Sequence, residues 1–582
     1  MRRYASIDFL RGFAIFMMIA LHTIQDSLDS SLINNIGTLP LISGVALILL
    51  NFMGGLAGFF LLVSAIGNMI SMQRHLQAGK PVKELAVRQI VGGLILLLFA
   101  CLTEGIIGYK GAIGELIRLN PNAWQLALWR EYHMETIQTI AWCVIINGAV
   151  QALLSRGNAW QKPRRMMKIY AVLAVAVVAA TPLIWWLISG PIAGIASPNY
   201  SGLIPGYPFA YYPGTSGRQV QYPLEGVTTP WGYFYLLLLA PLAGFPEPIF
   251  PYLAVSFLGS IVGIIMSQPR EEIPRDFPKK GMFVGMAMFL VGIIFLLLDY
   301  ITIMNGSGGA GAAISIYSDI WNHRAYGQFS TTYNGQTILY PAGMWLFQFL
   351  VLNGAALFAT LLVVRLVEFR GKGARFAKQT TTIRRYGFVA FSVYNYQFFA
   401  FPLQLILSLI VYGTPTYQSF TWPGMLLLVV LAYLEFQAIL LLWEKVNYVG
   451  SIEWCIGTIG AAIIPARKKE KAERGPKWWQ KGMLDVKGSF YEPEWLNIVE
   501  VDEIPHEELK ESKLAWKLSL MSFLVFPLGI SAYLIGKRAI PTEQENKYNR
   551  RAMRVGIAGF IWGVFWIVVL SVVSLAMVGI SL

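Results

Sequence analysis

The sequence predicts an all-α polytopic integral membrane protein. Of its 582 residues, 55% are hydrophobic and 13% are charged, with a mean hydropathy of +0.54. Soluble domains average about 25% charged residues. Long apolar runs recur along the chain, each close to the roughly 20 residues that a spanning helix needs. Together these observations predict a bundle of membrane-crossing helices.

The main body, residues 1–465, is predicted to hold ten spans. Two further apolar runs, 41–51 and 232–243, are too short to be additional spans, so we expect interfacial or re-entrant pieces there. The ten predicted spans are 7–24, 53–72, 87–107, 135–154, 168–189, 249–267, 282–303, 340–364, 387–411 and 424–446.

Lysine and arginine divide the connecting loops into two sides. The loops on one side hold 20 of these residues and those on the other side hold 5. Basic loops stay in the cytosol, so we expect a cytosolic N-terminus and extracytosolic long loops at 191–230 and 304–338. This topology accounts for the net charge of +14 without a nucleic-acid partner. The basic loops are 73–88, 155–168, 268–280 and 365–385; the others are 25–40, 108–133, 191–230, 304–338 and 413–423.

The first span carries three ionisable residues, Asp8, Arg11 and His22. Arg11 and His22 are eleven residues apart, about three helical turns, so they share one helix face about 16 Å apart. Ionisable groups inside membrane helices usually face a wet cavity or the bundle interior. Two structural alternatives remain open: Arg11 reaching the headgroups, and His22 as a satisfied polar residue at the helix end.

The C-terminal part divides into a linker and a membrane segment. Residues 466–512 are predicted to be a cytosolic linker, basic and then acidic, and 513–582 to contain a re-entrant segment and one span. The re-entrant segment is 514–536, because a span there would put the basic loop that follows it outside. The stretch FPLGISAYLIGKRA from Phe526 weakly resembles the hairpin of the interferon-induced transmembrane, or dispanin-like, family. This resemblance implies a membrane-shaping or assembly module.

Six short motifs follow one another in a recognisable order along the main body. Together they resemble the membrane acyltransferase superfamily, which includes the bacterial glycan O-acyltransferases and the heparan-α-glucosaminide N-acetyltransferases. The resemblance implies an acyltransferase-like bundle that uses acetyl-CoA or another acyl-CoA as co-substrate. The motifs are Ser6–Gly12 with His22, Gly58–Ser64, Gln138–Ala141, Phe250–Leu253 with Gly259, Tyr386–Gln397 and Gly450–Trp454.

The resemblance also implies site residues. His22 is the expected catalytic residue, because loop 25–40 contains no histidine to replace it. Histidine suits proton abstraction near neutral pH, although covalent acyl transfer through the ring is an alternative. Arg11 suits contact with CoA phosphates or the thioester, and Asp8 is placed to orient it. Ser64 joins Arg11 as an expected co-substrate contact.

Acceptor contacts are expected on the outer side. Glu135 and Gln138 are three residues apart at the start of a span and are candidates to line an acceptor pocket, although a simple helix cap is the alternative. His323, in an outer loop, is a candidate contact for a glycan. Histidines and carboxylates lack metal-ligand spacing, so no metal is expected.

The expected function is acyl transfer from cytosolic acyl-CoA to a glycan, lipid-linked or other polar acceptor at the outer face of a cell membrane. Membrane lipid is the other expected partner, and the sequence leaves homo-oligomerisation open. A transporter or lipid-handling channel would use a similar cavity, although we find no repeat between the halves of the kind transporters often show. A purely structural membrane protein assembled through residues 514–580 is the third alternative.

Overall fold

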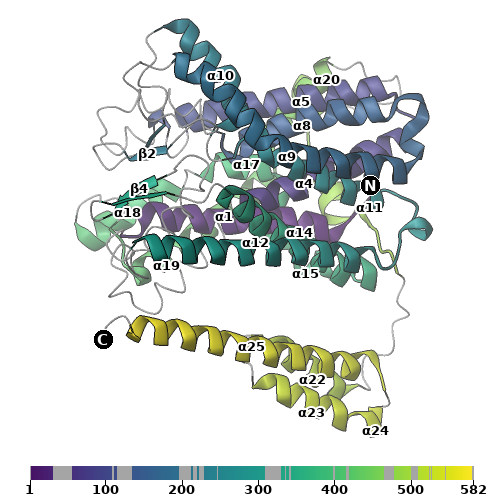
Figure 1. Ribbon diagram of the computed structural model, residues 1–582. Helices are drawn as coiled ribbons and strands as arrows, with labels where there is room; N and C mark the ends of the chain where they lie inside the picture. Colours follow the sequence, from purple (N-terminus) through teal and green to yellow (C-terminus); the bar gives the residue numbers. More distant parts are fainter. Residues whose placement is uncertain are drawn as a thin grey trace. The chain divides into compact units, whose positions relative to one another are not determined.

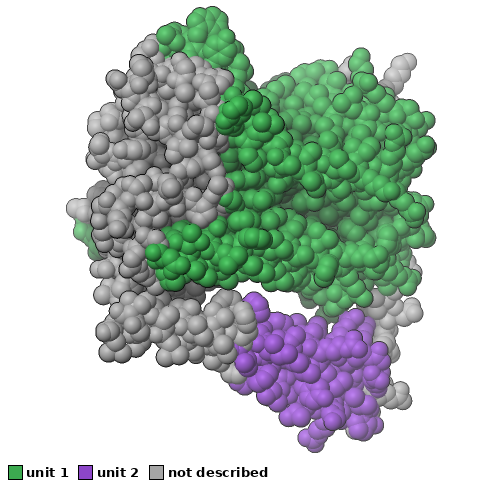
Figure 2. Space-filling model, in the orientation of Figure 1, with its two compact units in different colours: residues 1–499 green, residues 500–582 purple. Residues whose placement is uncertain are grey.

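The computed structural model confirms an all-α polytopic membrane protein, in which eight helices of the described residues are long and apolar enough to cross a membrane. The chain forms two compact units, residues 1–499 and 500–582 (Figure 2). The structure describes residues 2–29, 56–107, 111–113, 134–195, 211–213, 219–221, 229–244, 247–307, 330–333, 336–339, 343–397, 400–413, 419–463, 477–499, 509–523, 525, 527–543 and 545–579.

The first unit is built almost wholly of helices (Figure 1). Its helices are α1 Ala5–Ser27, α4 Leu56–Gln77, α5 Val82–Leu102, η2 Thr103–Ile107, α8 Thr136–Leu154, η3 Arg156–Gln161, α9 Pro163–Ile195, α10 Pro230–Ala243, α11 Ile249–Met266, η5 Arg270–Glu272, α12 Phe277–Ser307, α14 Met344–Val367, η6 Glu368–Arg370, α15 Gly373–Gln379, α16 Thr381–Phe388, α17 Ala390–Asn395, α18 Ala400–Tyr412, α19 Trp422–Glu444, α20 Ile452–Ile463, η8 Trp478–Gly482 and η9 Lys487–Tyr491. Its strands are β1 Arg2–Arg3, β2 Tyr211–Pro213, β3 Gln219–Gln221, β4 Ser330–Tyr333, β5 Gln336–Leu339 and β6 Glu494–Trp495.

Eight of the ten predicted spans are continuous apolar helices, namely α1, α5, α8, α9, α11, α12, α14 and α19. The predicted span 53–72 corresponds to α4, a helix of 22 residues whose first half is apolar. The short apolar run 232–243 lies in α10, a helix of 14 residues. The run 41–51 lies outside the described residues.

The single helix predicted over 387–411 is wrong, because the structure breaks this segment twice. Helix α16 ends at Phe388, α17 occupies only six residues, and α18 begins at Ala400. The backbone leaves helical geometry at Val389, with φ −124° and ψ 51°. Broken helices at membrane depth occur where protein or a cavity, and not lipid, surrounds the exposed backbone groups. The break therefore marks an interior position in the bundle.

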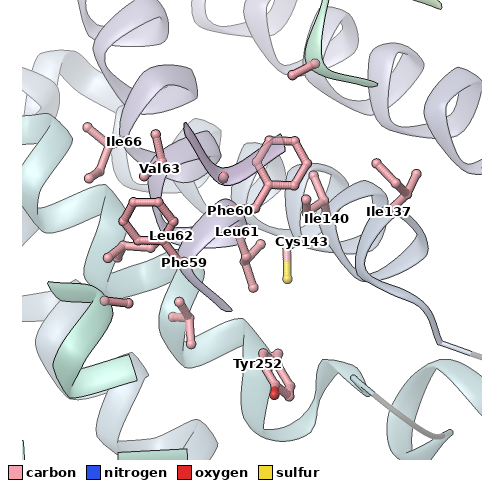
Figure 3. Close-up of a cluster of buried hydrophobic side chains, with 14 of the residues drawn as sticks. Phe59, Phe60, Leu61, Leu62, Val63, Ile66, Ile137, Ile140, Cys143 and Tyr252 are labelled. Atoms are coloured by element: carbon pink, nitrogen blue, oxygen red, sulfur yellow. The ribbon is translucent and has the colours of Figure 1, made fainter. Parts of the chain in front are cut away.

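Burial separates the central helices from the peripheral ones. In α11, 78% of the most apolar window is buried, against 17% in α12. Phe283 and Leu297 of α12 stay 74% and 57% exposed, as expected for a helix that faces lipid. The core between α4, α8 and α11 is apolar (Figure 3). The labelled core residues are Phe59, Phe60, Leu61, Leu62, Val63 and Ile66 of α4, Ile137, Ile140 and Cys143 of α8, and Tyr252 of α11.

Helix α1 lies unusually close to α16. A Cβ atom added at Gly387 would lie 2.5 Å from the backbone nitrogen of Gly12 and 2.8 Å from the carbonyl oxygen of Asp8. A Cβ atom at Gly12 would in turn collide with the Ile383 carbonyl group. Glycine is needed at both positions because only hydrogen in place of Cβ permits this backbone approach. The broken segment is thus held directly against the first span.

Residues 477–499 pack onto the beginning of α1. Strand β6 pairs in parallel with β1, with Arg3 opposite Trp495, and the N–H of Leu496 donates to the Arg3 carbonyl at 2.9 Å. The N–H of Ile498 donates to the Glu368 carbonyl, also at 2.9 Å. This stretch, expected from its composition to be part of a cytosolic linker, belongs to the first compact unit.

The second unit is a small helical assembly of α22 Lys510–Met521, α23 Leu528–Arg538, α24 Ile540–Glu543 and α25 Lys547–Gly579. Helices α22, α23 and α25 pack against one another. A Cβ atom at Gly556 would lie 2.6 Å from the Gly529 carbonyl oxygen, so α23 and α25 are in close contact. The chain breaks between α22 and α23, in the region where the sequence FPLG interrupts the apolar run.

Three helices share an unusual N-terminal arrangement, in which a glutamate from a distant element accepts hydrogen bonds from the first turn. Glu368 Oε1 accepts from the N–H of Ser6 in α1 at 2.9 Å. Glu453 Oε1 accepts from the N–H of Phe391 in α17 at 2.8 Å. Glu543 accepts from the first turn of α22. None of these three helices has a cap from its own N-cap side chain. A negative charge there satisfies orphan donors and complements the helix dipole.

Candidate active site

Arg11 lies on the side of α1 that faces α4. A Cβ atom added at Gly67 of α4 would lie 2.5 Å from Arg11 Nη2, so the missing side chain provides the space for the guanidinium group. Asp8 and Glu453 are the carboxylates close enough to stabilise its charge, and Arg3 opposes it. Arg11 is therefore held among protein groups, which argues for a role beyond simple contact with lipid headgroups.

Asp8 forms its ion pair with Arg3, whose Nη2 lies 2.9 Å from Asp8 Oδ1. Arg3 also donates through Nη1 to the Ser489 carbonyl at 2.6 Å. Through Arg3, Asp8 thus connects the start of α1 to residues 477–499. Its effect on Arg11, one helical turn away, is electrostatic attraction.

His22 contacts the end of α17. Its Nδ1 lies 2.6 Å from Oε1 of Gln397, two residues after that helix. Because an amide oxygen can only accept, this contact places the proton of a neutral imidazole on Nδ1 and the lone pair on Nε2. Nε2 is then the nitrogen that can accept a proton. Sequence reasoning missed Gln397 as the partner of His22, although the residue ends one of the six motifs.

The motifs Tyr386–Gln397 and Gly450–Trp454 are joined by hydrogen bonds at α17. Ser392 Oγ donates to Glu453 Oε2 at 2.5 Å and accepts from the N–H of Ile452 at 2.8 Å. At the other end of the helix, Asn395 accepts a hydrogen bond from Thr103 in η2. Glu453, which lies in the last of the six motifs, caps α17. The same carboxylate is an electrostatic neighbour of Arg11. Arg11 and His22 are therefore joined through α17 and its brace.

Ser64, one turn of α4 away from Gly67, lies on the wall of a small cavity that is lined by apolar as well as polar residues. Its side chain is buried, and its Oγ has no hydrogen-bond partner among the described residues. Nε2 of Gln151, also buried, is similarly unpaired in the same cavity. Neither Arg11 nor His22 lines this space. Its polar lining comes from α4, α5, α8 and α11 and consists of Ser64, Asn68, Gln89, Asn147, Gln151 and Ser256.

A hydrogen-bonded network fixes one wall of this cavity. Asn147 Nδ2 donates to Ser260 Oγ at 2.6 Å and to Ser256 Oγ at 3.0 Å. Tyr170 donates through its hydroxyl to Asn147 Oδ1 at 3.0 Å. The cavity wall thus combines fixed amide and hydroxyl groups with two unsatisfied ones, and it carries no charged side chain. Such a surface suits an uncharged ligand with its own amides or hydroxyls.

The candidate acceptor residues occupy the start of α8. Gln138 Oε1 accepts from the N–H of Glu135 at 2.7 Å, so Gln138 caps the helix. Glu135 lies within electrostatic range of the Tyr394 hydroxyl, together with Glu104 and Glu247. Tyr394 belongs to α17, which places this acidic surrounding beside the element that contacts His22. His323 lies outside the described residues.

The beginning of α1 lies among arginines that the sequence analysis did not single out. Arg384 donates to the carbonyls of Ala377 and Phe490 at 2.8 and 2.6 Å, and its guanidinium stacks on the Trp495 ring at 4.5 Å. Burial lowers the pKa of Arg384 to about 10, and the Asp8 carboxylate partly opposes this shift. Arg385 pairs with Glu444 at 2.7 Å. Their partners lie far apart in the sequence, so no local pattern reveals them.

Within the ranges given above, no group of three or more His, Cys, Asp or Glu side chains is arranged to hold a metal ion.

Comparison with known families gives one match. Residues 3–205 match the family model described as "Heparan-alpha-glucosaminide N-acetyltransferase, catalytic". The matched part contains α1, α4, α5, α8 and α9, and therefore Arg11, His22 and Ser64. No curated protein matches the chain. The match indicates a transferase of the membrane acetyltransferase type and supports, over residues 3–205, the resemblance found in the motifs.

Proposed function

We propose that the protein moves an acyl group, and acetyl in particular, from cytosolic acyl-CoA to a sugar or another polar acceptor at the outer face of the membrane. Acyl-CoA is a co-substrate in this reaction, and the acceptor is a glycan or lipid-linked molecule. The observation that carries the proposal is the contact of His22 with Gln397 at 2.6 Å, on a helix of the matched family.

Acyl transfer needs a base that takes a proton from the acceptor and then gives it to the departing thiolate of CoA. Nε2 of His22 takes the proton of the acceptor hydroxyl or amine while that group attacks the thioester carbonyl carbon. The new C–O or C–N bond forms, the C–S bond breaks, and the imidazolium returns its proton to the departing thiolate. The products are the acylated acceptor and free CoA, and His22 is neutral again. A positioned general base typically contributes about 10²–10⁴-fold to such a step.

Arg11 supplies the positive charge. Its planar fork of donors can hold the thioester oxygen as negative charge develops there, or a phosphate of CoA. The space at Gly67 lets the guanidinium extend toward α4. In the proposed orientation Arg11 lies toward the cytosolic end of α1 and His22 toward the outer end, which matches a donor and an acceptor arriving from opposite sides.

The cavity at Ser64 offers hydrogen-bonding partners for the middle part of the donor, and its walls must move apart to admit more than about one water molecule. The pantetheine arm of CoA is uncharged and carries two amides and a hydroxyl group. Ser64 Oγ and Gln151 Nε2 are buried polar atoms whose partners are missing among the described residues, and such atoms are costly unless something pairs with them. Amide and hydroxyl groups of the arm would satisfy both.

The proposal is tested with purified protein in lipid nanodiscs, radiolabelled acetyl-CoA and a panel of amino sugars and sugar alcohols. We expect acylated acceptor and free CoA in equal amounts. His22→Ala is expected to lower kcat by about 10²–10⁴-fold while the melting temperature stays unchanged. His75→Ala, which changes the same residue type at the end of α4, is the matched control and should retain activity.

Two outcomes would count against the proposal. Wild-type rates in His22→Ala would remove the catalytic assignment. A well-folded protein that acylates no acceptor, yet moves a polar solute into vesicles, would favour a transporter, for which the broken segment α16–α18 is also typical.

A further inference from the structure

We infer that Gln397 is the positioning residue of His22, and that α17 exists in order to hold this glutamine in place. The inference rests on the proposed function, because it assigns a role within the same reaction. It begins from the 2.6 Å contact between His22 Nδ1 and Gln397 Oε1, which joins two residues 375 positions apart in the sequence.

The contact selects one form of the ring. A neutral imidazole carries its proton on either nitrogen, and the two forms have similar energies in water. The amide oxygen of Gln397 stabilises the form with the proton on Nδ1, in which the lone pair is on Nε2. An uncharged partner also leaves the positive charge of the imidazolium without a carboxylate beside it at this nitrogen. The ring therefore gives up its proton to the thiolate more readily than it would with an aspartate there.

Gln397 needs support from other elements because α17 is too short to be stable alone. A six-residue helix cannot offset the cost of its own nucleation. Glu453 holds the first turn through Phe391 and Ser392 at 2.8 and 2.5 Å. At the far end, Asn395 Nδ2 donates to the Phe391 carbonyl at 2.7 Å while its Oδ1 accepts from Thr103. The position of Gln397 is thus set by α20 and η2.

Glu453 connects the surroundings of Arg11 with those of His22. Glu453 is an electrostatic neighbour of Arg11 as well as the cap of the helix that ends near Gln397. A neutral variant at this position would disturb Arg11 and His22 together. Gln397→Leu, in contrast, removes only the hydrogen-bond acceptor beside His22. Gln397 is therefore the residue that separates positioning of the ring from the rest of the site.

The experiment uses the whole chain with ¹⁵N-labelled histidine and four variants. Nitrogen chemical shifts report the tautomer of His22 without any substrate, and His22→Ala identifies its signals. We expect the Nδ1-protonated form in the wild type and a mixture of forms in Gln397→Leu. With acetyl-CoA and an accepted sugar, kcat of Gln397→Leu should fall by about 10- to 100-fold while KM for acetyl-CoA stays within about twofold.

Gln397→Glu is the second variant, since its carboxylate also accepts from Nδ1–H and restores the tautomer. Its kcat should exceed that of Gln397→Leu. The matched control is Gln77→Leu, which removes a glutamine that donates to the Ser267 carbonyl at 3.0 Å and should leave tautomer and kcat unchanged. An unaltered His22 tautomer in Gln397→Leu would overturn the inference. Loss of the tautomer preference in a protein that never transfers acyl groups would overturn the proposed function and still support the role of Gln397.

Discussion

Helices α1 and α17 both begin with a carboxylate contributed from elsewhere, and they differ in how much depends on it. Helix α1 has 23 residues and α17 has six. The long apolar helix has its own hydrogen bonds and a wide buried face, so a lost cap frays one turn. The short one has little besides its caps. The comparison shows that α1, which carries Arg11 and His22, is determined by its own sequence. In contrast, α17, which positions Gln397 beside His22, depends on residues far away in the sequence.

The largest loss of stability is expected from a substitution that forces α1 and α16 apart. In Gly12→Ala, the new methyl group would collide with the Ile383 carbonyl of α16, and one of the two helices must move. Overpacking against backbone is expected to cost about 3 kcal/mol, measured as a lower melting temperature in detergent and a loss of monodisperse protein. Gly460→Ala in α20 is the matched control, because a Cβ atom there meets nothing within 4 Å. Equal stability of the two variants would show that α1 and α16 are not in backbone contact.

The next largest effect on stability is expected from loss of Glu453, which caps α17. Glu453→Ala removes acceptors for both Phe391 and Ser392, and loss of an N-terminal cap typically costs about 1–2 kcal/mol. Because α17 ends near Gln397, activity should fall by more than this small loss of stability explains. Glu453→Gln keeps one acceptor oxygen and should recover most of the stability. Activity that follows stability in both variants would contradict a role for α17 in orienting His22.

The smallest effect concerns the cap of α22 in the second unit. Burial disfavours the charged carboxylate of Glu543, but hydrogen bonds from Ser512 and Glu511 outweigh this effect and lower its pKa. A lowered folded-state pKa adds stability that is present above the usual glutamate pKa and is lost as the pH falls through the folded value. Glu543→Gln should therefore be less stable by about 0.5–1 kcal/mol at pH 7, with the difference from wild type closing in acid. Thermal unfolding between pH 7 and pH 3 measures it; a difference that stays constant with pH would contradict the charged cap.

The sequence predicts α1 well, because the residues between Arg11 and His22 are apolar and the spacing of the two residues fits one face of a helix. Ser64, which the motifs single out, lines the cavity between α4, α5, α8 and α11, and its contact with the co-substrate stays a prediction. The sequence prediction fails over 387–411, where apolar composition predicts one helix and the structure has three. No local pattern shows that Glu453 will meet Ser392, since the contact depends on how α20 packs. The pairing of His22 with Gln397 is missed for the same reason.

The parallel pairing of β1 with β6 has a consequence for how the protein is made. Helix α1 is synthesised long before β6, so its starting residues acquire their final neighbours only once Trp495 has been synthesised. The Asp8–Arg3 pair likewise completes its surroundings only when Ser489 arrives. Helix α1 is therefore among the last elements of the first unit to be finished, and a ribosome that stops before this point releases a bundle in which α1 still lacks its closing strand.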